Sequence, residues 1–550
     1  MKFERWLLRI LASPFKKRTV IGVTLLAFVG SLWMFPSQLV KAKMLPGKSA
    51  DTFSVYVDLP KGSSHVQTSA VTQCVTSLLS LEPHVRSMSV YAGMGAPLDY
   101  AGLVKGSGLK RGEHVAEIVV NLTDKTTREE ASFALVHRVR PVVQHDCEPL
   151  VEGTRIKMVE EPAGPPTLAA IVVELYGEND ALLRELNAHV QEVLRGTPGL
   201  VDVDTLEEAA HDTFTLEIDA ARVLSTGVDL KQVHDIVYLA YEGTQVAAQN
   251  RGDSYTQVPL FLRLDAPHTS LHVKSANALH ARLASLHLHT NTGALVPVSE
   301  LVRIVPSRLA PTLFSKNLRR MHTVVAETDL VSQVYPLLEA RSRLKEVLGA
   351  SYTITNGSLF DLKLVHKATG EPIELVWDGE MKVTMDTFAD LGGAFIAALV
   401  VIFLLMVVYY KSFALGGIIL LGSFLSIIGV IVGHWIMDIF THTTFFLTAT
   451  SLIGFIALMG INSRNSLLII DFAKSMMDAG MPKRNAIAHS AATRAKPIFL
   501  TAITVVLASA MLALDPIFGG LGVALIFGTM ASVIVSLVFV PVLLDQSPAI

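Results

Sequence analysis

Long apolar stretches constrain this chain more than any other feature, because five of them crowd into the last third of its 550 residues. A membrane-spanning helix needs about 20 apolar residues, with a range near 17 to 25. The stretches are Thr19 to Phe35, Phe395 to Tyr410, Ala414 to Val432, Phe445 to Phe472, Ile498 to Leu514 and Gly519 to Leu544. The sequence therefore predicts an α-helical membrane bundle of six spans, one before and five after a large extramembrane region.

The distribution of Lys and Arg predicts which way the bundle is oriented. Basic residues fill the leader 1–18, the turn at Lys411 and the connection 474–496, and six crossings place all three on one side. Cytoplasmic loops carry the excess of Lys and Arg, so that side is predicted to be the cytoplasm. A cleaved signal peptide ending near Ala42 is the alternative. The long basic leader favours an uncleaved anchor.

The extracytoplasmic region repeats a strand, helix, strand pattern, which is typical of split βαβ units in an α+β architecture. Residues 213–305 break the rhythm, and residues 360–372 look polar and irregular. The predicted parts are a basic leader at 1–18, a first span at 19–36, a βαβ-βαβ porter subdomain at 37–165, a second porter subdomain at 166–212 and 306–375, an inserted subdomain at 213–305, an interfacial helix at 376–390 and five spans at 391–550.

The two cysteines, Cys74 and Cys147, both lie outside the cytoplasm in this topology. That compartment permits a disulfide. Two cysteines about 70 residues apart could bridge, or each could be a small buried residue. We expect the second arrangement. The spacing of the cysteines is not that of a metal site.

Arg464 and Asn465 lie inside a predicted span with apolar residues on both sides. An arginine near the middle of a membrane costs about 2.5–3.5 kcal/mol on insertion scales. Arg464 precedes Phe472 by eight residues, or about 12 Å of helix, which is too deep for easy snorkelling to the surface. A functional role is therefore favoured over a surface-seeking one, whereas Asp471 and Lys474 are expected to mark the cytoplasmic surface.

The carboxylate that should pair with Arg464 is missing from the six predicted spans. Asp438, Asp471, Asp515 and Asp545 all fall at span ends. A buried cation without a counter-charge is strongly disfavoured, so the partner is predicted to lie on another chain.

Several motifs of the chain resemble the carboxy-terminal half of the resistance–nodulation–cell division (RND) efflux transporters of the acriflavin-resistance or multidrug-like branch. The resemblance covers essentially the whole chain. It rests on GINSRNSLLIIDFAKS at 460–475, RAKPIFLT at 494–501, the last span at 520–544, AGPPTLAAIVVELYG at 163–177 and KMLPGKSADTFSVYVDLPKG at 43–62.

This resemblance implies a secondary active transporter, a proton antiporter rather than an enzyme, without cofactors and without a nucleic-acid partner. In the family, two aspartates of the amino-terminal half bind protons, and a basic residue on the carboxy-terminal half senses their charge. Arg464, Asn465, Arg494 and Thr501 take these relay positions. Arginine stays charged where the family often has lysine, so Arg464 is expected to be a fixed counter-charge.

The family also implies partners and a place in the cell. An amino-terminal half on another chain, a trimeric assembly, a periplasmic adaptor, an outer-membrane channel and the lipid of a bacterial inner membrane would surround this chain. The inserted subdomain would meet the channel. Val90 to Gly106 aligns with a substrate-lining stretch and makes Tyr91, Met94 and Tyr100 candidate substrate contacts, although an ordinary strand end and turn is an equal alternative.

The family has a heavy-metal branch, whose members would need soft ligands for the metal. His287 and His289 share a predicted strand face, which is more simply a solvated strand. His434 and His442 bracket a periplasmic turn and are expected at the surface. Metal export is thus poorly supported, and no resident metal is predicted.

These observations predict a proton-driven half-transporter that exports a substrate from the periplasm or membrane and needs an acidic amino-terminal half. The alternative is an inactive fragment or a non-transporting membrane scaffold derived from such a transporter. A neighbouring reading frame with paired acids in its fourth span would favour the transporter.

Overall fold

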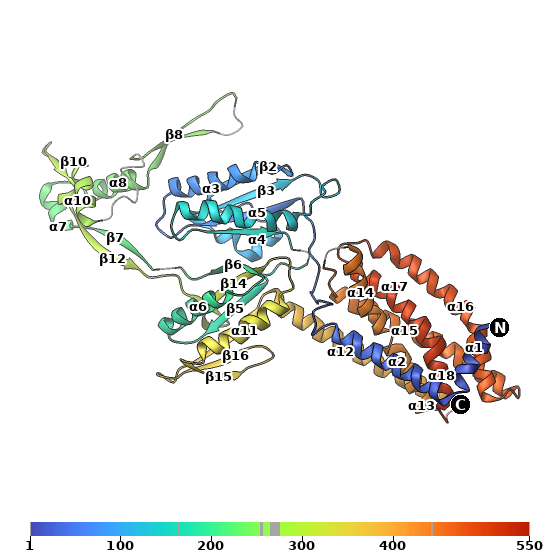
Figure 1. Cartoon of the computed structure of the whole chain (residues 1–550). Coiled ribbons are helices and arrows are strands. Elements are labelled where there is room, and N and C mark those ends of the chain that lie inside the picture. Colours follow the sequence, from blue (N-terminus) through green and yellow to red (C-terminus); the bar gives the residue numbers. More distant parts are fainter. Residues whose placement is uncertain are drawn as a thin grey trace.

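The computed structural model of the chain is elongated, with two stacked sheet domains between a projecting arm and a helical bundle (Figure 1). It describes residues 2–162, 164–208, 210–253, 257–264, 275–441 and 444–548. Both described ends of the chain lie in the bundle, at the end remote from the sheets.

The first sheet has four antiparallel strands in the order β2-β3-β1-β4. Its elements are β1 (Thr52–Asp58), α3 (His65–Leu79), β2 (Val85–Met94), α4 (Tyr100–Lys105), β3 (Arg111–Leu122), α5 (Ser132–Cys147) and β4 (Arg155–Glu160). Ser64 caps α3 in a reciprocal pair with Gln67, which fixes where the helix begins. Val55 and Val57 of β1 are fully buried in the core that α3 and α5 cover.

The second sheet has seven antiparallel strands in the order β13-β14-β5-β17-β16-β15, with β6 also paired to β14. Its elements are β5 (Ile171–Tyr176), α6 (Asp180–Arg195), β6 (Leu200–Thr205), β13 (Phe314–Lys316), β14 (Arg319–Thr328), α11 (Val334–Leu348), β15 (Tyr352–Asn356), β16 (Leu362–His366) and β17 (Pro372–Asp378). Every residue of β5 is buried because this strand runs through the middle of the sheet under α6.

The projecting arm leaves the second sheet through two long antiparallel strands, β7 (His211–Ile218) and β12 (Val302–Leu309). At its tip they carry a small domain with its own core. This domain contains α7 (Ala220–Thr226), α8 (Leu230–Tyr241), β8 (Thr244–Gln249), β9 (Val258–Leu262), α10 (Ala276–Ala284), β10 (His287–His289) and β11 (Leu295–Pro297). Both histidines of β10 are exposed.

The two cysteines form a disulfide, so the expectation of two separate buried residues was wrong. Cys74 on α3 and Cys147 at the end of α5 have Cα atoms 5.8 Å apart. The two helices pack side by side on the same face of the first sheet, which brings together residues 73 positions apart in sequence. Sequence spacing alone contains no record of this helix pairing.

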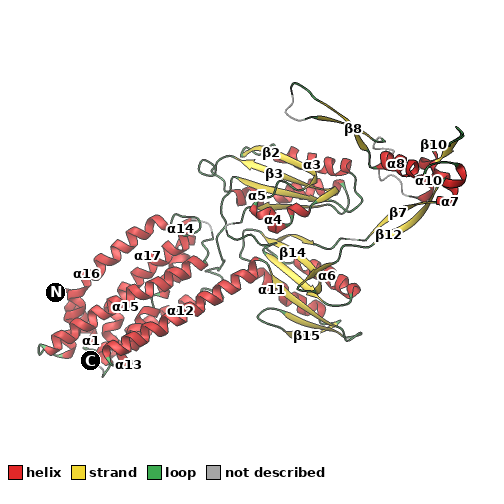
Figure 2. Cartoon of the chain, turned by 180° about the vertical axis from the view of Figure 1, so that it is seen from behind, coloured by secondary structure: helices red, strands yellow, loops and turns green. Residues whose placement is uncertain are grey.

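Two expected boundaries near the membrane were also wrong. Residues 360–372 are not irregular, because β16 and the start of β17 lie there. The interfacial helix expected at 376–390 is not a separate element, because α12 (Glu380–Tyr410) continues without a break into the bundle (Figure 2). The amide of Glu380 donates to the Ala169 carbonyl at 3.1 Å, which fastens the start of α12 to the second sheet.

The bundle contains α1 (Lys2–Leu11), α2 (Pro14–Trp33), α12, α13 (Phe413–Phe424), α14 (Ile427–Thr441), α15 (Ala449–Asp478), α16 (Lys483–Leu512), α17 (Gly519–Ile534) and α18 (Val540–Gln546). Among the described residues, five helical segments are long and apolar enough to cross a membrane: 380–410, 413–441, 449–478, 483–512 and 519–546. Helix α2 is outside that set and has Lys16, Lys17 and Arg18 near its start.

A line of ion pairs joins the two sheet domains. Every cation comes from the first domain and every acid from the second: Lys61–Glu208 at 2.7 Å, Lys105–Glu327 at 2.6 Å, Lys157–Asp204 at 2.5 Å, Arg140–Asp202 at 3.3 Å and Arg140–Asp329 at 2.9 Å. We call this set the porter seam. The facing walls therefore have opposite charge, which aligns the two domains.

Candidate functional site

Helix α15 determines where the predicted relay residues lie. Thr448 caps its first turn, and the helix then runs for 30 residues without interruption. Ile453, Ala457, Gly460 and Arg464 are exposed, and their spacings of four, three and four residues place them on one side of the helix. Asn465 follows Arg464 but turns inward and is 3 % exposed.

Arg464 points away from the chain's own helices. Its side chain makes no hydrogen bond or ion pair with any residue that the structure describes. The adjacent residues of α15 that face the other way, Asn462 and Ser463, are buried against neighbouring helices. The guanidinium is therefore left on an outer surface of the bundle at the depth of the membrane.

Arg494 and Thr501 lie on α16, which packs against α15. The Arg494 guanidinium stacks over the Phe472 ring at 4.7 Å, and its Nε has no partner among the described residues. Thr501 is exposed, and its hydroxyl donates to the Ile498 carbonyl at 2.9 Å.

Helices α15 and α16 run antiparallel, so the positions of their residues along the bundle can be compared. Arg464 lies about 12 Å from Phe472 along α15, and Thr501 lies about 10 Å from Arg494 along α16. Because Arg494 sits over Phe472, Arg464 and Thr501 have similar depths, and Arg494 lies nearer the end of the bundle that holds both described chain ends.

Asn462 is a functional candidate that the sequence analysis missed. Its side chain donates to the Gly422 carbonyl at 2.7 Å and accepts from the Ser536 hydroxyl at 2.8 Å. Gly422 lies next to the break between α13 and α14, and Ser536 lies in a π-helical turn, Val535–Phe539. Such a turn often marks a functional or mobile point in a helix. Asn462 is two residues from Arg464, so its position in the same polar segment was the available signal.

Asp471 does not pair with Arg464. It accepts a hydrogen bond from the Tyr410 hydroxyl at 2.6 Å, and the Lys474 ammonium lies 4.8 Å from the centre of the Tyr410 ring. The three side chains tie the end of α12 to α15. Tyr410 was not singled out from sequence, because a tyrosine at the end of an apolar stretch is common in membrane helices.

The expectation of a surface position for His434 was wrong. This residue is fully buried, and its two ring nitrogens lie 2.7 Å from the Val430 carbonyl and 2.8 Å from the Ser451 hydroxyl. The cause is that α14 continues to Thr441 and packs against α15 and α17, so His434 lies within a helix and not at a turn. His442 is outside the described residues.

The predicted substrate residues lie at one edge of the first sheet. Tyr91 is half-buried on the edge strand β2, whereas Met94 is 56 % exposed and Tyr100, at the start of α4, is 70 % exposed. No ring contact joins the two tyrosines in the described part of the chain. Met94 and Tyr100 instead belong to an exposed apolar surface completed by Leu98, Leu103 and Leu109.

Glu117 holds this edge loop in place. Its carboxylate is buried on β3, accepts from the Ala96 amide at 2.9 Å and also accepts from the Ser107 hydroxyl. Backbone also approaches closely here, because a Cβ on Gly95 would lie 2.1 Å from the Ser107 carbonyl oxygen. The exposed apolar side chains are therefore carried by a fixed loop.

Comparison with known proteins agrees with the resemblance drawn from the motifs. The model of the AcrB/AcrD/AcrF family matches residues 2–545. The chain is 22% identical over 386 residues to the cobalt-zinc-cadmium resistance protein CzcA of Cupriavidus metallidurans, which covers 68% of this chain and 33% of that protein. It is 21% identical over 382 residues to the swarming motility protein SwrC of Bacillus subtilis, covering 68% and 32%.

A solved structure of a heavy metal efflux pump, crystal form II, has the same fold with a TM-score of 0.71 at 18% identity. The match covers 99% of this chain and 52% of the pump. The chain thus spans about half of that pump, and it aligns with about a third of each curated relative. These relatives do not single out the multidrug branch that the motifs suggested.

Proposed function

Because the chain belongs to the AcrB/AcrD/AcrF family of RND efflux permeases, which are inner-membrane transporters, we propose that it is a half-subunit of a proton-driven exporter. It moves substrate from the periplasm or inner membrane toward an outer-membrane channel. The other half of the membrane domain is supplied by a separate chain whose fourth span carries the proton-binding aspartates.

The exposed and unpaired guanidinium of Arg464 is the observation that carries this proposal. Lipid is a poor environment for a fixed cation, and a charge in a span normally faces a partner or a water-filled space. A second copy of this chain would add another cation at the same depth. A partner with carboxylates opposite Arg464 supplies the missing charge.

The surface around Arg464 supports close contact with another helix. Ala457 and Gly460 precede Arg464 on the exposed side of α15, and a Cβ on Gly460 would meet no atom of the described chain within 4 Å. Small residues at such spacing allow helix backbones to approach closely in membranes. A partner helix lying here would place its own side chains within reach of the guanidinium.

Proton coupling follows from the fixed charge of arginine. When the partner's carboxylates are ionised, Arg464 pairs with them and holds the two halves in one arrangement. A proton from the periplasm neutralises a carboxylate and weakens that pair, so the spans shift, and release of the proton to the cytoplasm restores it. Asn465 orients this pair, and Thr501 and Arg494 respond along α16, Arg494 on the cytoplasmic side.

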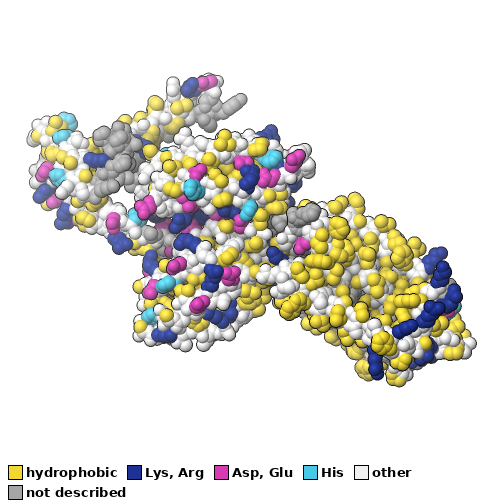
Figure 3. All heavy atoms as spheres, in the orientation of Figure 1, with side chains coloured by type: hydrophobic (Ala, Val, Ile, Leu, Met, Phe, Trp, Pro, Cys, Tyr) yellow, Lys and Arg dark blue, Asp and Glu magenta, His cyan; other side chains and the backbone are white. Residues whose placement is uncertain are grey.

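The first apolar helix completes the proposed topology. Helix α2 packs against α14 and acts as the sixth span, with residues 14–18 at the cytoplasmic surface. Lys and Arg side chains gather at the end of the bundle remote from the sheets, and hydrophobic side chains cover its flank (Figure 3). This arrangement supports placing the sheet domains and the arm in the periplasm.

The periplasmic part carries substrate and meets the partners. Substrate contacts Met94, Tyr100 and, at the edge of β2, Tyr91. Helix α12 continues from the second sheet into the membrane, so movement of the spans reaches the porter seam directly. The arm domain docks toward an outer-membrane channel within a trimeric assembly that includes a periplasmic adaptor.

The test is expression in a pump-deficient cell, with and without an amino-terminal half that carries paired acids. We expect proton-coupled efflux only when both chains are present, and loss of efflux when the acids are changed to amides. Efflux by this chain alone, in a background without related halves, would contradict the half-subunit. Absence of efflux with every acidic half, together with stable insertion, would favour the non-transporting scaffold.

A further inference from the structure

A cavity of about 580 Å³ lies where the two sheet domains meet the membrane bundle. Its wall comes from the segment between α2 and β1, the end of β4, the end of β14, the start of α12 and the loop before α15. The volume is in the range of about 300–1,000 Å³ that small-molecule sites occupy. It is separate from the outer face of α15 and from the edge loop with Tyr100.

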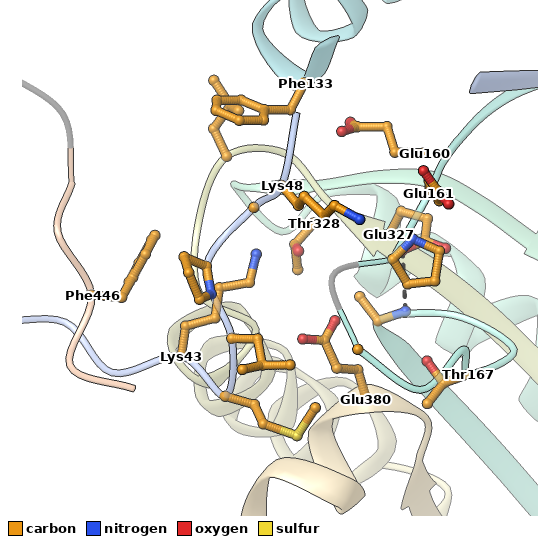
Figure 4. Close-up of a pocket in the computed structure, with 18 of the residues that line it drawn as sticks. Lys43, Lys48, Phe133, Glu160, Glu161, Thr167, Glu327, Thr328, Glu380 and Phe446 are labelled. Atoms are coloured by element: carbon orange, nitrogen blue, oxygen red, sulfur yellow. Dashed lines mark hydrogen bonds between the residues drawn. The ribbon is translucent and has the colours of Figure 1, made fainter. Parts of the chain in front are cut away.

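The cavity is lined by charged side chains of both signs that make no ion pair with a described residue. Figure 4 shows Lys43 and Lys48 reaching in from one segment, Glu380 from the start of α12, and Glu160 from the end of β4. None of the four makes an ion pair with a described residue, and Glu380 alone makes a side-chain hydrogen bond, with Gln333.

Of the other charged residues of this wall, Lys105, Glu327 and Arg140 are paired, whereas Glu161 is exposed and makes no ion pair with a described residue. Lys105 pairs with Glu327 at 2.6 Å, and Glu327 also accepts from the Ala170 amide at 3.1 Å. Arg140 pairs with Asp329 at 2.9 Å. Lys43, Lys48, Glu160 and Glu380 thus form a set without ion pairs around the cavity, and Lys43 is near enough to lower the pKa of Glu160.

The floor of the cavity is apolar and adjoins the membrane domain. Phe445, Phe446 and Met44 line it, and Phe446 lies three residues before α15. Backbone hydrogen bonds from Lys43 to Leu447 at 3.1 Å and from Leu447 to Lys41 at 2.8 Å hold the two segments together. They place the Lys43 ammonium 5.7 Å from the centre of the Phe446 ring.

We propose that this cavity binds the headgroup of a zwitterionic phospholipid of the phosphoethanolamine class, drawn from the outer leaflet of the membrane. The phosphate contacts Lys43 and Lys48, and the ammonium contacts Glu380 and Glu160. The acyl chains descend over Phe446 toward the bundle. A ligand with one charge would leave half of this set without a partner, whereas a zwitterion satisfies both halves.

The raised pKa of Glu160 is consistent with a ligand that carries an ammonium group. Burial raises the pKa of Glu160 to about 7, with Glu327 and Asp329 adding to the rise and Arg140 and Lys43 opposing it. An ammonium beside the carboxylate would lower that pKa again. Headgroup binding should therefore be weaker below pH 7, where Glu160 takes up a proton in the empty cavity.

Native mass spectrometry of the delipidated full chain tests this inference by adding back defined lipids. We expect phosphatidylethanolamine to bind about tenfold more tightly than phosphatidylglycerol, which has the phosphate but no ammonium. Glu380→Gln and Lys43→Gln should each weaken phosphatidylethanolamine binding by about tenfold. Lys382→Gln and Asp386→Asn change exposed residues of the same helix outside the cavity and should leave binding unchanged.

Three outcomes would overturn the proposal. Equal binding of phosphatidylethanolamine and phosphatidylglycerol would show that the ammonium group makes no contact in the cavity. Equal loss in the cavity variants and the two controls would show a general surface effect. Binding of soluble phosphoethanolamine as tightly as the lipid would assign the cavity to a free metabolite. Lys43→Arg, which keeps the charge, should retain binding and thereby separates loss of contact from loss of folding.

Discussion

The porter seam and the outer face of α15 differ in whether their charged side chains have partners within the described chain. In the seam, Arg140 is 5 % exposed and Asp202 is 1 % exposed at the side chain, and both lie within a set of paired groups. On α15, Arg464 is exposed and has no partner in the described chain. The chain therefore pairs the charges of the porter seam internally, whereas Arg464 has no partner among the described residues.

This difference supports the proposed partner chain. Breaking a buried ion pair costs about 3–5 kcal/mol because the remaining charge stays desolvated. The porter seam avoids that cost within one chain, and the two sheet domains can pack without help. If the proposed partner chain pairs with Arg464, assembly should stabilise the bundle more than the sheets.

The largest expected effect is on export through Arg464. Arg464→Ala removes the only cation on this face of α15 in the described chain, so proton-coupled efflux by the assembled transporter should fall to background. Membrane insertion should be unchanged or improved, because a costly charge is gone. Efflux of a fluorescent substrate from cells, normalised to membrane protein, measures this.

Two variants sharpen the result for Arg464. Arg464→Lys should keep part of the efflux, since the charge remains but the planar guanidinium is lost. Lys496→Ala changes an exposed cation on α16 and should have little effect. Wild-type efflux in the Arg464→Ala variant would show that Arg464 takes no part in the proposed proton relay.

The next effect concerns the porter seam. Arg140→Ala leaves Asp202 and Asp329 without their shared cation and should destabilise the contact between the sheet domains by about 4 kcal/mol. Burial raises the pKa of Asp202 although Arg140 is near, so desolvation dominates at this carboxyl. Hydrogen exchange of β4 and β6 in the purified chain reports the loss. Arg138→Ala, at an exposed pair with Glu82, should cost under about 1 kcal/mol.

Sequence reasoning succeeded where the signal was local and failed where packing decided the outcome. The five apolar stretches in the last third were readable because each depends on residues adjacent in the chain. The pairing of Cys74 with Cys147 depends on α3 and α5 meeting on a sheet, and the burial of His434 depends on α14 lying against other helices. The sequence positions of these residues reveal neither the disulfide pairing nor the burial of His434.

The cavity residues illustrate the same limit. Lys43, Glu160 and Glu380 lie more than 100 residues apart, in three segments that no sequence pattern links. The meeting of β4, α12 and the loop before α15 brings them together. Arg464 could be predicted to need a partner, but its outward direction depends on which side of α15 packs against α13, α16 and α17.

A smaller effect is expected from the disulfide. Reduction, or Cys74→Ser with Cys147→Ser, should destabilise the first sheet domain by roughly 3 kcal/mol, since the link closes a long loop between α3 and α5. Faster hydrogen exchange in α3 and α5, with unchanged exchange in α6, is the expected result. Equal exchange with and without the link would show that sheet packing alone fixes these helices.

The smallest effect is a pH dependence that distinguishes the paired acid Asp58 of the first sheet domain from Glu160 of the cavity. Although burial opposes it, Lys157 and Lys110 hold the pKa of Asp58 well below its usual range, so Asp58 adds stability that is lost only on strong acidification. The contribution of Glu160 to stability changes with pH in the opposite direction. Its folded pKa of about 7 exceeds the unfolded value, so the folded state binds more protons and stability falls as pH rises from about 4.5 to 7.

Glu160→Gln removes this proton uptake while keeping the shape of the side chain. The variant should match the wild type near pH 4, where Glu160 is already neutral, and exceed it at pH 8 by less than about 3 kcal/mol. Hydrogen exchange of β4 in lipid-free detergent across this range gives the difference. Adding phosphatidylethanolamine should shrink the gap at pH 8, because a bound ammonium compensates the Glu160 charge only in the wild type. A constant gap at all pH values would mean that Glu160 does not titrate in the empty cavity.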